Sequence, residues 1–376
     1  MTESTQVELT IIGGGLAGLS LGQQLASTPL GLKTLIIEPR EAYANDRTWS
    51  FWAPPAHQFD QLVSKTWNGW AYGELHAPPR IHNTPETPYQ SIRSIEFYQA
   101  ASQAIFSADD VELALGERVE GYQRLNTGWL IQTNEREIQT RYVIDTRPPN
   151  NSQLENTKML QCFIGEHLVM AHAFNPDQAE LMTDMIADEH GFLFSYVLPL
   201  SRDEALVEAT RFSAGAIPWP ILKTDLDQIK TRRGWREAQV TGEEKARLPM
   251  GLKPRRNRDK SWVHAGTAAG GLRAASGYGF MRIQRWAKQC HDALRADHKP
   301  IGHPAEPRLQ GWMDELFLDV LIHEPARVPE LFHCLYSRAP VDSLIRFMSD
   351  QSSLLDKLQI IRSLPAKPFL RTMMRR

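Results

Sequence analysis

The alternation of hydrophobic and polar positions at the start of the chain predicts a strand, a turn and a helix. Apolar residues fill positions 9–12 and stop at a glycine-rich segment, 13–18, after which leucines recur at helical spacing. A second apolar run covers 34–37 and ends at Glu38. This order of elements predicts the β-turn-α-β unit that binds nucleotides.

The glycines of this turn, Gly13, Gly15 and Gly18, have the spacing G-x-G-x-x-G. The first permits a tight turn, the second lets the backbone approach a pyrophosphate, and the third lets helix and strand pack closely. The helix N-terminus adds unpaired N–H groups that favour an anion. Glu38 then stands where an acid accepts hydrogen bonds from a ribose. An ordinary βα turn is the alternative interpretation.

The remaining pattern predicts an α/β protein whose nucleotide-binding domain is split by an inserted sheet. Ser94 is expected to cap a helix with an apolar stripe, and residues 45–52 form an aromatic-rich loop. Strands are expected at 111–115, 129–133, 141–147, 192–200, 205–208 and 262–265, a helix at 280–296, and helical segments broken by prolines from 309 onward. We therefore assign 1–150 and 250–300 to nucleotide binding, 151–249 to a substrate-binding sheet, and 301–376 to a helical C-terminal region.

Composition and charge exclude several classes of protein. The net charge is −2 and the basic residues are dispersed, which argues against a nucleic-acid binder. The three cysteines, Cys162, Cys290 and Cys334, are far apart, and the histidines have no metal-ligand spacing, so neither a disulfide framework nor a metal site is expected. The first residues are polar, and no apolar run reaches the roughly 18 residues of a spanning helix. A cytoplasmic protein, in solution or at a membrane surface, is expected.

A second glycine cluster, which includes Gly270, Gly277 and Gly279, follows the strand at 262–265. FAD is long, so its adenosine end can lie on the first glycine turn while its ring system reaches the second. Backbone N–H groups at a helix start there would stabilise negative charge on a reduced ring. Asp145, at the end of another strand, is expected beside the flavin.

Several segments carry a resemblance to the bacterial lycopene cyclase family of flavoproteins. The similar segments are 45–51, 89–97, 143–145, 194–201, 206–210, 276–278 and 355–368. The most specific is Leu-Val-Glu-Ala-Thr at 206–210, which resembles the family's Glu-Asp/Glu-Thr motif and places its first acid at Glu208. Two departures stand out. Ala209 replaces the second acid, and Arg273-Ala274 replaces the family's usual His-Pro before the Thr-Gly-Tyr turn.

The resemblance implies a Rossmann-type FAD-binding domain and non-redox cyclisation of lycopene end groups to β-rings, with reduced FAD required and NAD(P)H a possible reductant. Glu208 is the implied catalytic acid, although a strand-end glutamate in water is the plainer interpretation. Arg273 either favours an anionic flavin or binds an acidic substrate group. The other cofactor candidates are Arg93, which could instead cap a helix, and Tyr278. The remaining substrate-lining candidates are aromatic, and for each of them simple core packing is the alternative: Trp49, Phe51, Trp52 and Tyr196.

A long hydrocarbon substrate implies contact with a membrane surface, at the inner face of the membrane. The candidate contact segments are 368–376 and 217–221, which mix apolar residues with prolines or positive charge. Three alternatives stay open: a redox flavoprotein of the same scaffold (hydroxylase, halogenase or polyprenyl reductase), a cyclase of a different polyene, and a non-catalytic flavin- or carotenoid-binding protein. The sequence also leaves open a β or an ε product.

Overall fold

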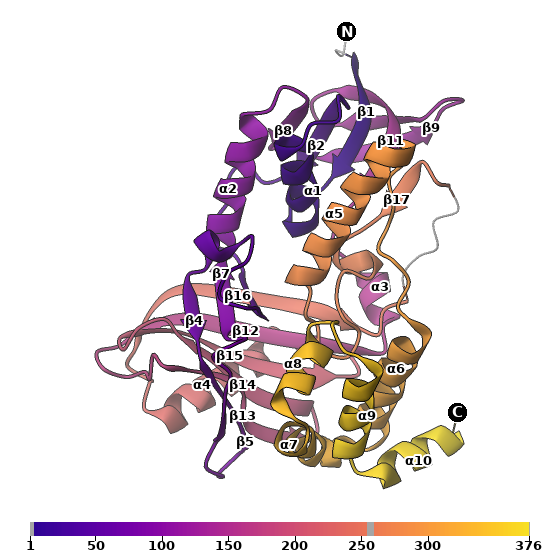
Figure 1. Ribbon diagram of the computed structural model, residues 1–376. Coiled ribbons are helices and arrows are strands. Elements are labelled where there is room, and N and C mark those ends of the chain that lie inside the picture. The colour runs from indigo at the N-terminus through magenta and orange to yellow at the C-terminus, as the bar shows by residue number, and fades with distance from the viewer. Residues whose placement is uncertain (1–3, 254–258, 376) are drawn as a thin grey trace.

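A parallel sheet with helices on one face forms the upper part of the computed structural model, which describes residues 4–253 and 259–375 (Figure 1). Strands β8, β2, β1, β11 and β17 run parallel, and β10 and β9 extend the sheet antiparallel. The bounds are β1 (Ser4–Ile12), β2 (Thr34–Glu38), β8 (Val111–Leu115), β9 (Val119–Arg124), β10 (Trp129–Thr133), β11 (Glu137–Asp145) and β17 (Trp262–His264). This arrangement confirms the predicted Rossmann-type domain and the late return of the chain to it.

Helices α1 (Leu16–Ser27), α2 (Ser94–Phe106) and α5 (Phe280–Asp297) pack against this sheet through one apolar core. Their apolar stripes face the strands, as the sequence periodicity predicts. The predicted cap at Ser94 is wrong. Ser94 is the first helical residue, and its hydroxyl accepts the N–H groups of Asp46 and Arg47 instead.

A second sheet lies below the first and has the order β16-β12-β15-β14-β13-β5-β6 (Figure 1). Its strands are β5 (Gly69–Glu74), β6 (Arg80–Asn83), β12 (Met159–Val169), β13 (Gln178–Asp188), β14 (Gly191–Pro199), β15 (Glu204–Ser213) and β16 (Gln239–Met250). The predicted boundary at residue 150 therefore needs correction: residues 69–83, expected in the nucleotide-binding domain, complete the second sheet because β5 pairs in parallel with β13.

Different helices cover the two faces of the second sheet. Helix α4 (Trp219–Arg233) packs on one face with the side chains of Cys162, Ile164 and Ala209, while α3 (Asn151–Glu155) precedes β12. The C-terminal helices cover the other face and build its core with Phe194 and Phe212. They are α6 (Arg308–His323), α7 (Val328–Arg338), α8 (Val341–Met348), α9 (Leu354–Ser363) and α10 (Ala366–Arg375).

A small third sheet, β3-β7-β4, joins the two regions. It consists of β3 (Thr48–Trp52), β4 (Lys65–Trp67) and β7 (Tyr89–Arg93), so part of the predicted loop at 45–52 is a strand. Within the described residues, no helix combines the length and apolarity needed to cross a membrane, and no cluster of three or more His, Cys, Asp or Glu side chains is arranged to hold a metal ion.

Candidate active site

The first glycine turn forms a cradle at the carboxyl end of β1. Gly13 has a φ of +105°, which favours glycine, and its carbonyl accepts a hydrogen bond from the Thr146 hydroxyl at 2.9 Å. A methyl group on Gly18 would lie 1.9 Å from the carbonyl oxygen of Gly13, whereas one on Gly15 would meet open space. The N-cap residue of α1 is Gly15, which has no side chain to cap the helix. The cradle thus has the close packing and the open backbone that a dinucleotide site requires.

Glu38 faces this cradle from the end of β2. Its carboxylate accepts the N–H of Gly14 at 2.7 Å and the Nε–H of Arg40 at 2.8 Å. The hydroxyl of Tyr43 donates to the Gly14 carbonyl at 2.8 Å. The sequence analysis missed Arg40 and Tyr43, although the position of Arg40 two residues after the acid was an available signal.

Two other predicted cofactor residues lie in different surroundings. Asp145 ends β11 beside the end of β1, and its carboxylate pairs with Arg147 at 2.6 Å. It also faces the His264 ring at 3.7 Å. Arg93 is exposed and directly precedes α2, so it occupies the helix-cap position that was its alternative interpretation. The role of each toward a cofactor stays a prediction.

The second glycine cluster brings a tight turn to the start of α5. The N–H of Arg273 donates to the carbonyl of Tyr278 at 2.9 Å, and the N–H of Gly277 donates to the carbonyl of Arg273 at 2.9 Å. Gly270 ends a short helical turn just upstream, and Gly279 directly precedes α5. The turn lies between the upper sheet and the cavity described next.

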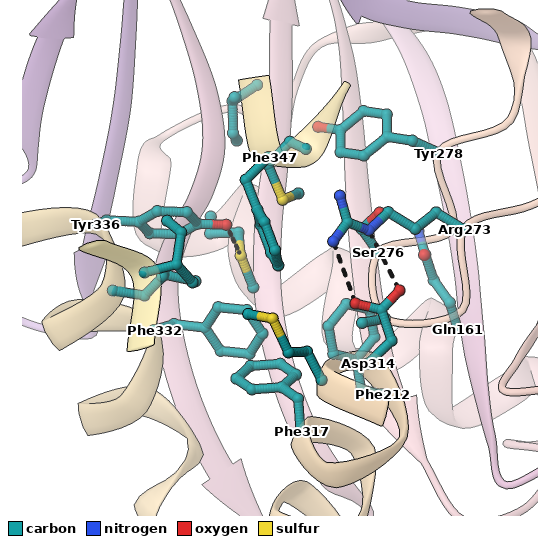
Figure 2. A pocket seen from close by; sticks show the side chains of 18 of the residues that line it. Gln161, Phe212, Arg273, Ser276, Tyr278, Asp314, Phe317, Phe332, Tyr336 and Phe347 are labelled. Atoms are coloured by element: carbon teal, nitrogen blue, oxygen red, sulfur yellow. Dashed lines mark hydrogen bonds and ion pairs between the residues drawn. The ribbon is translucent and has the colours of Figure 1, made fainter. Parts of the chain in front are cut away.

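A cavity of about 420 Å³ separates the second sheet from the C-terminal helices (Figure 2). Its wall is mostly aromatic and aliphatic, which suits an apolar ligand. Of the predicted lining and turn residues, those that line it are Trp49, Tyr196, Glu208, Arg273, Gly277, Tyr278 and Gly279. Phe51 packs against Phe280 instead, with ring centroids 5.0 Å apart, and Trp52 packs against Tyr89 at 4.7 Å.

Glu208 reaches the cavity from β15, and only 8% of its surface is exposed. The hydroxyl of Thr210 donates to its carboxylate at 3.4 Å. Burial raises the pKa of Glu208 well above its usual value, and the charge of Glu244 raises it further. The raised pKa favours the protonated form of the carboxyl group, which can act as an acid in an apolar environment.

Three tyrosine hydroxyls form a chain along the cavity wall. Tyr89 contacts Tyr196 at 2.8 Å and Tyr278 at 3.2 Å between hydroxyl oxygens. Burial raises the pKa of all three well above the usual value, so they are neutral and satisfy one another. The sequence predicted roles for Tyr196 and Tyr278 but not for Tyr89, although Tyr89 begins the segment 89–97 that resembles the family.

Arg273 is 1% exposed and points at Asp314 of α6, with Nη2 3.1 Å from Oδ1 (Figure 2). A second carboxylate, Asp350, lies 3.6 Å from its Nη1. The Phe347 ring lies 4.0 Å from the guanidinium carbon. The positive charge predicted from the sequence is thus matched by two carboxylates, and its role toward a flavin or substrate stays a prediction.

Known structures share this fold at low sequence identity. A geranylgeranyl bacteriochlorophyll reductase-like protein from Thermoplasma acidophilum matches with a TM-score of 0.61 and 15% identity, over 99% of this chain and 96% of that one. A flavoprotein/dehydrogenase from Cytophaga hutchinsonii matches with a TM-score of 0.62 and 11% identity, over 95% and 99%.

Sequence comparison is more specific. Lycopene beta-cyclases of Pseudescherichia vulneris and Pantoea ananas are 27% and 25% identical to this chain, each over 96% of it and over 95% and 96% of their own lengths. The family model described as lycopene cyclase protein matches residues 8–374. With a match over nearly its whole length, the chain belongs to the lycopene cyclase family.

Proposed function

We propose that this protein catalyses the flavin-dependent, non-redox cyclisation of lycopene end groups to β-rings and requires reduced FAD. The observation that carries the proposal is the buried carboxyl group of Glu208 on the wall of an apolar cavity. A protonated carboxyl group in such a place can deliver a proton to a hydrocarbon, which offers no polar atom to bind. The reaction is an isomerisation and belongs with the intramolecular lyases.

The proposed steps balance without a redox partner. The Glu208 proton adds to a terminal double bond of the polyene and leaves a tertiary cation. An internal double bond attacks this cation, and a new carbon–carbon bond closes the ring. Loss of a ring proton to the Glu208 carboxylate restores both the acid and a double bond. The carboxylate and the aromatic rings of Trp49 and Tyr196 stabilise the intervening positive charge.

The residues present fit FAD. The cradle around Gly13, Gly15 and Gly18 suits the pyrophosphate, and Glu38 suits the ribose. The turn at 277–279 lines the cavity, where it suits the ring system. When bound, reduced FAD would supply electron density beside the cationic end group. NAD(P)H is a possible source of the reducing equivalents.

Anaerobic incubation of the FAD-loaded protein with lycopene in liposomes tests this proposal. We expect cyclic product, identified by chromatography, with chemically reduced FAD and none with oxidised FAD. Unchanged lycopene in both arms, with the flavin bound and reducible, would overturn the substrate assignment. NAD(P)H oxidation in a one-to-one ratio with product would instead indicate a redox flavoprotein.

The variant Glu208→Gln tests whether Glu208 is the general acid of the proposed reaction. Removing a general acid costs about 10²–10⁴-fold in rate, while flavin binding should be unchanged because Glu208 lies in the second sheet. Glu204→Gln on the same strand is the matched control and should keep full activity. Equal activity of the Glu208 and Glu204 variants would remove Glu208 from the mechanism.

We also propose that the C-terminal helices contact the cytoplasmic face of a membrane. The exposed apolar side chains that form this C-terminal apolar patch are Trp312, Leu354, Leu355, Leu358, Ile361, Leu370, Met373 and Met374. Four of them, Trp312, Ile361, Leu370 and Met373, also line the cavity, so the patch adjoins it. Helix α10 carries lysine and arginine among them, which favours an anionic lipid surface.

The other predicted membrane segment, 217–221, offers less apolar surface. Ile217 is buried, and the Arg247 guanidinium lies 4.3 Å above the Trp219 ring. Residue Arg376 of the first segment lies outside the described residues. Co-flotation with anionic liposomes tests the assignment. Leu370→Ser with Met374→Ser should weaken binding, whereas Phe106→Ser, which removes an 89% exposed side chain from α2, should not. Equal flotation of all variants would refute membrane contact by the C-terminal apolar patch.

A further inference from the structure

Glu208 is one member of a row of side chains that crosses the second sheet. In the strand register, Gly165 of β12 pairs with Glu208 of β15 on one side and with Glu244 of β16 on the other. Residues at one level of neighbouring strands project from the same face. Since Gly165 has no side chain, nothing from β12 stands between the two carboxyl groups.

Glu208 leans over the central glycine. A methyl group on Gly165 would lie 2.7 Å from Cγ and 3.5 Å from Cδ of Glu208. The side chain of Glu208 therefore occupies the space above β12, on the way to β16. This position needs glycine at residue 165, because any larger residue would push the carboxyl group away.

Glu244 is as deeply buried as its neighbour, with 4% of its surface exposed. One carboxyl oxygen, Oε2, accepts the N–H of Thr48 at 2.8 Å. The other, Oε1, is buried and has no hydrogen-bond donor among the residues that the structure describes. The nearest cationic candidate, His167 Nε2, is 3.9 Å away, beyond hydrogen-bond range. A buried acceptor without a donor is costly, so a proton shared with Glu208 would satisfy this oxygen.

Two carboxylates that face each other in an apolar site cannot both ionise cheaply. The first to lose its proton disfavours ionisation of the second, so the pair keeps one proton over a wide pH range. Burial raises the pKa of Glu244 to about 7 although the hydroxyl and the N–H of Thr48 lower it, and the charge of Glu244 in turn raises the pKa of Glu208. The raised pKa values of both groups therefore agree with their positions in the strand register on either side of Gly165.

We propose that Glu244 is a positioning residue that shares a single proton with Glu208 and so keeps Glu208 protonated for the reaction. This inference rests on the proposed function. Ala209, which replaces the second acid of the family motif, takes no part in this pair. Ala209 projects to the opposite face, toward α4, so an acid there would not have reached the cavity. In this chain the second carboxyl group comes from a different strand, β16.

The shared proton completes the proposed cycle. Glu208 gives its proton to the polyene, and both carboxyl groups of the pair are then ionised beside the cation. The ring proton returns to Glu208 when the double bond forms, and the pair regains its single proton. No oxidant or reductant enters this exchange. The transient second negative charge also strengthens attraction to the cation, because the cavity is apolar.

Other charged and titratable groups around the pair are few. From the segment before β3, Arg47 lowers the pKa of both carboxyl groups, while Asp46 raises that of Glu244. From β12, burial lowers the pKa of His167, and Arg93 lowers it further, so the ring is neutral at pH 7. From β14, Tyr196 stands opposite Glu208 in the register and is neutral as well.

The test is the pH profile of cyclisation by the FAD-loaded protein in wild type and Glu244→Gln. Loss of the neighbouring charge should lower the pKa of Glu208 and move the alkaline limb of the profile to lower pH by about one unit or more. A purely structural role for Glu244 would lower activity at every pH and leave the limb in place. Glu243→Gln is the matched control, since Glu243 is exposed and pairs with Lys245 at 3.0 Å; its profile should equal that of wild type.

A second readout does not depend on turnover. Difference infrared spectroscopy follows the carbonyl stretch of protonated carboxyl groups during a pH titration of the FAD-loaded protein. In wild type we expect two linked transitions, one for each carboxyl group. Each of the variants Glu208→Gln and Glu244→Gln should remove the transition of its own group and shift that of the other. If Glu244→Gln leaves the Glu208 transition unmoved, the shared proton is refuted. If wild type makes no cyclic product, the proposed function fails, and this titration still decides the pair.

Folding of the variants is checked by retention of bound flavin and by circular dichroism. Should Glu244→Gln fail to fold, Glu244→Asp carries the same test. Its carboxyl group stands one methylene further from Glu208, so the alkaline limb should move in the same direction by a smaller amount. An unshifted limb in a folded Glu244→Asp protein would count against the proposal.

Discussion

Replacing Arg273 with methionine removes the guanidinium that Asp314 faces in the interior. The two side chains are 1% and 3% exposed, and they meet through Nη2–Oδ1 at 3.1 Å and Nε–Oδ2 at 3.4 Å. After the substitution, the amide of Gln310, at 3.0 Å, still donates to Asp314, but the negative charge has lost its cation. Methionine fills much of the vacated volume, so the charge dominates the effect.

The expected loss of stability depends on which carboxylate is left without a cation. Asp350 keeps Arg282 at 2.7 Å and Arg285 at 3.0 Å, so the cost falls on Asp314. Breaking a buried ion pair by removing one partner costs about 3–5 kcal/mol. We expect the free energy of unfolding to fall by this amount at pH 7.

Urea unfolding followed by tryptophan fluorescence measures the effect. Arg118→Met is the matched control: its partner Glu120 lies 3.8 Å away and both side chains are more than half exposed, so the change should stay within about 1 kcal/mol. Adding Asp314→Asn to Arg273→Met should restore at least half of the lost stability, because the stranded charge is gone. A loss below about 1 kcal/mol in the single variant, or no recovery in the double variant, would refute the reasoning.

Three further predictions concern the cradle, the tyrosine chain and the carboxyl pair. Gly18→Ala places a methyl group 1.9 Å from the Gly13 carbonyl oxygen, so the purified protein should lose its flavin absorbance. Tyr89→Phe deprives two buried hydroxyls of their shared partner, and calorimetry should show a loss of about 1–3 kcal/mol. Glu244→Gln should stabilise the protein at pH 8 but not at pH 4, by up to about 3 kcal/mol. The folded-state pKa of Glu244 is raised to about 7, so wild type loses stability as pH rises from about 4.5 through that value.

A control variant, a contrary outcome or both test each of these predictions. Gly215→Ala meets open space and should keep its flavin; equal flavin content in both glycine variants contradicts the close packing at the cradle. Tyr43→Phe keeps the tyrosine chain intact and calibrates the loss of a single hydroxyl. A pH-independent difference between Glu244→Gln and wild type contradicts the raised pKa.

The sequence was sufficient for the parts of the site that are local in the chain. The turn around Gly13 and the acid at Glu38 belong to one β-turn-α-β unit, whose spacing alone determines their arrangement. Glu208 was carried over from a family motif that lies within one strand. Tyr278 was expected as a cofactor residue beside its glycine neighbours; the structure places it on the cavity wall, and its role toward a cofactor stays a prediction.

What the sequence could not predict depends on pairing between distant segments. Glu244 lies near Glu208 because both pair with Gly165 in the register of three strands. A shift of one residue in either strand pair would put the two carboxyl groups on opposite faces of the sheet. The partners of Arg273 lie on α6 and directly after α8, helices whose packing no local pattern determines. Residues 69–83 join the second sheet for the same reason: their strand signal does not say which sheet they extend.

The order in which the upper sheet is assembled has a consequence for synthesis on the ribosome. Helix α1 emerges first, yet its main helical neighbour α5 ends at Asp297, and β17 joins β11 only after the whole second sheet has been made. The nucleotide cradle therefore stays exposed to solvent through most of translation, and the apolar face of α1 that packs against α5 stays uncovered. Contacts of such long sequence separation fold slowly. Loading of the proposed FAD would accordingly be a late step, and slow translation between β11 and β17 should raise the demand for chaperones.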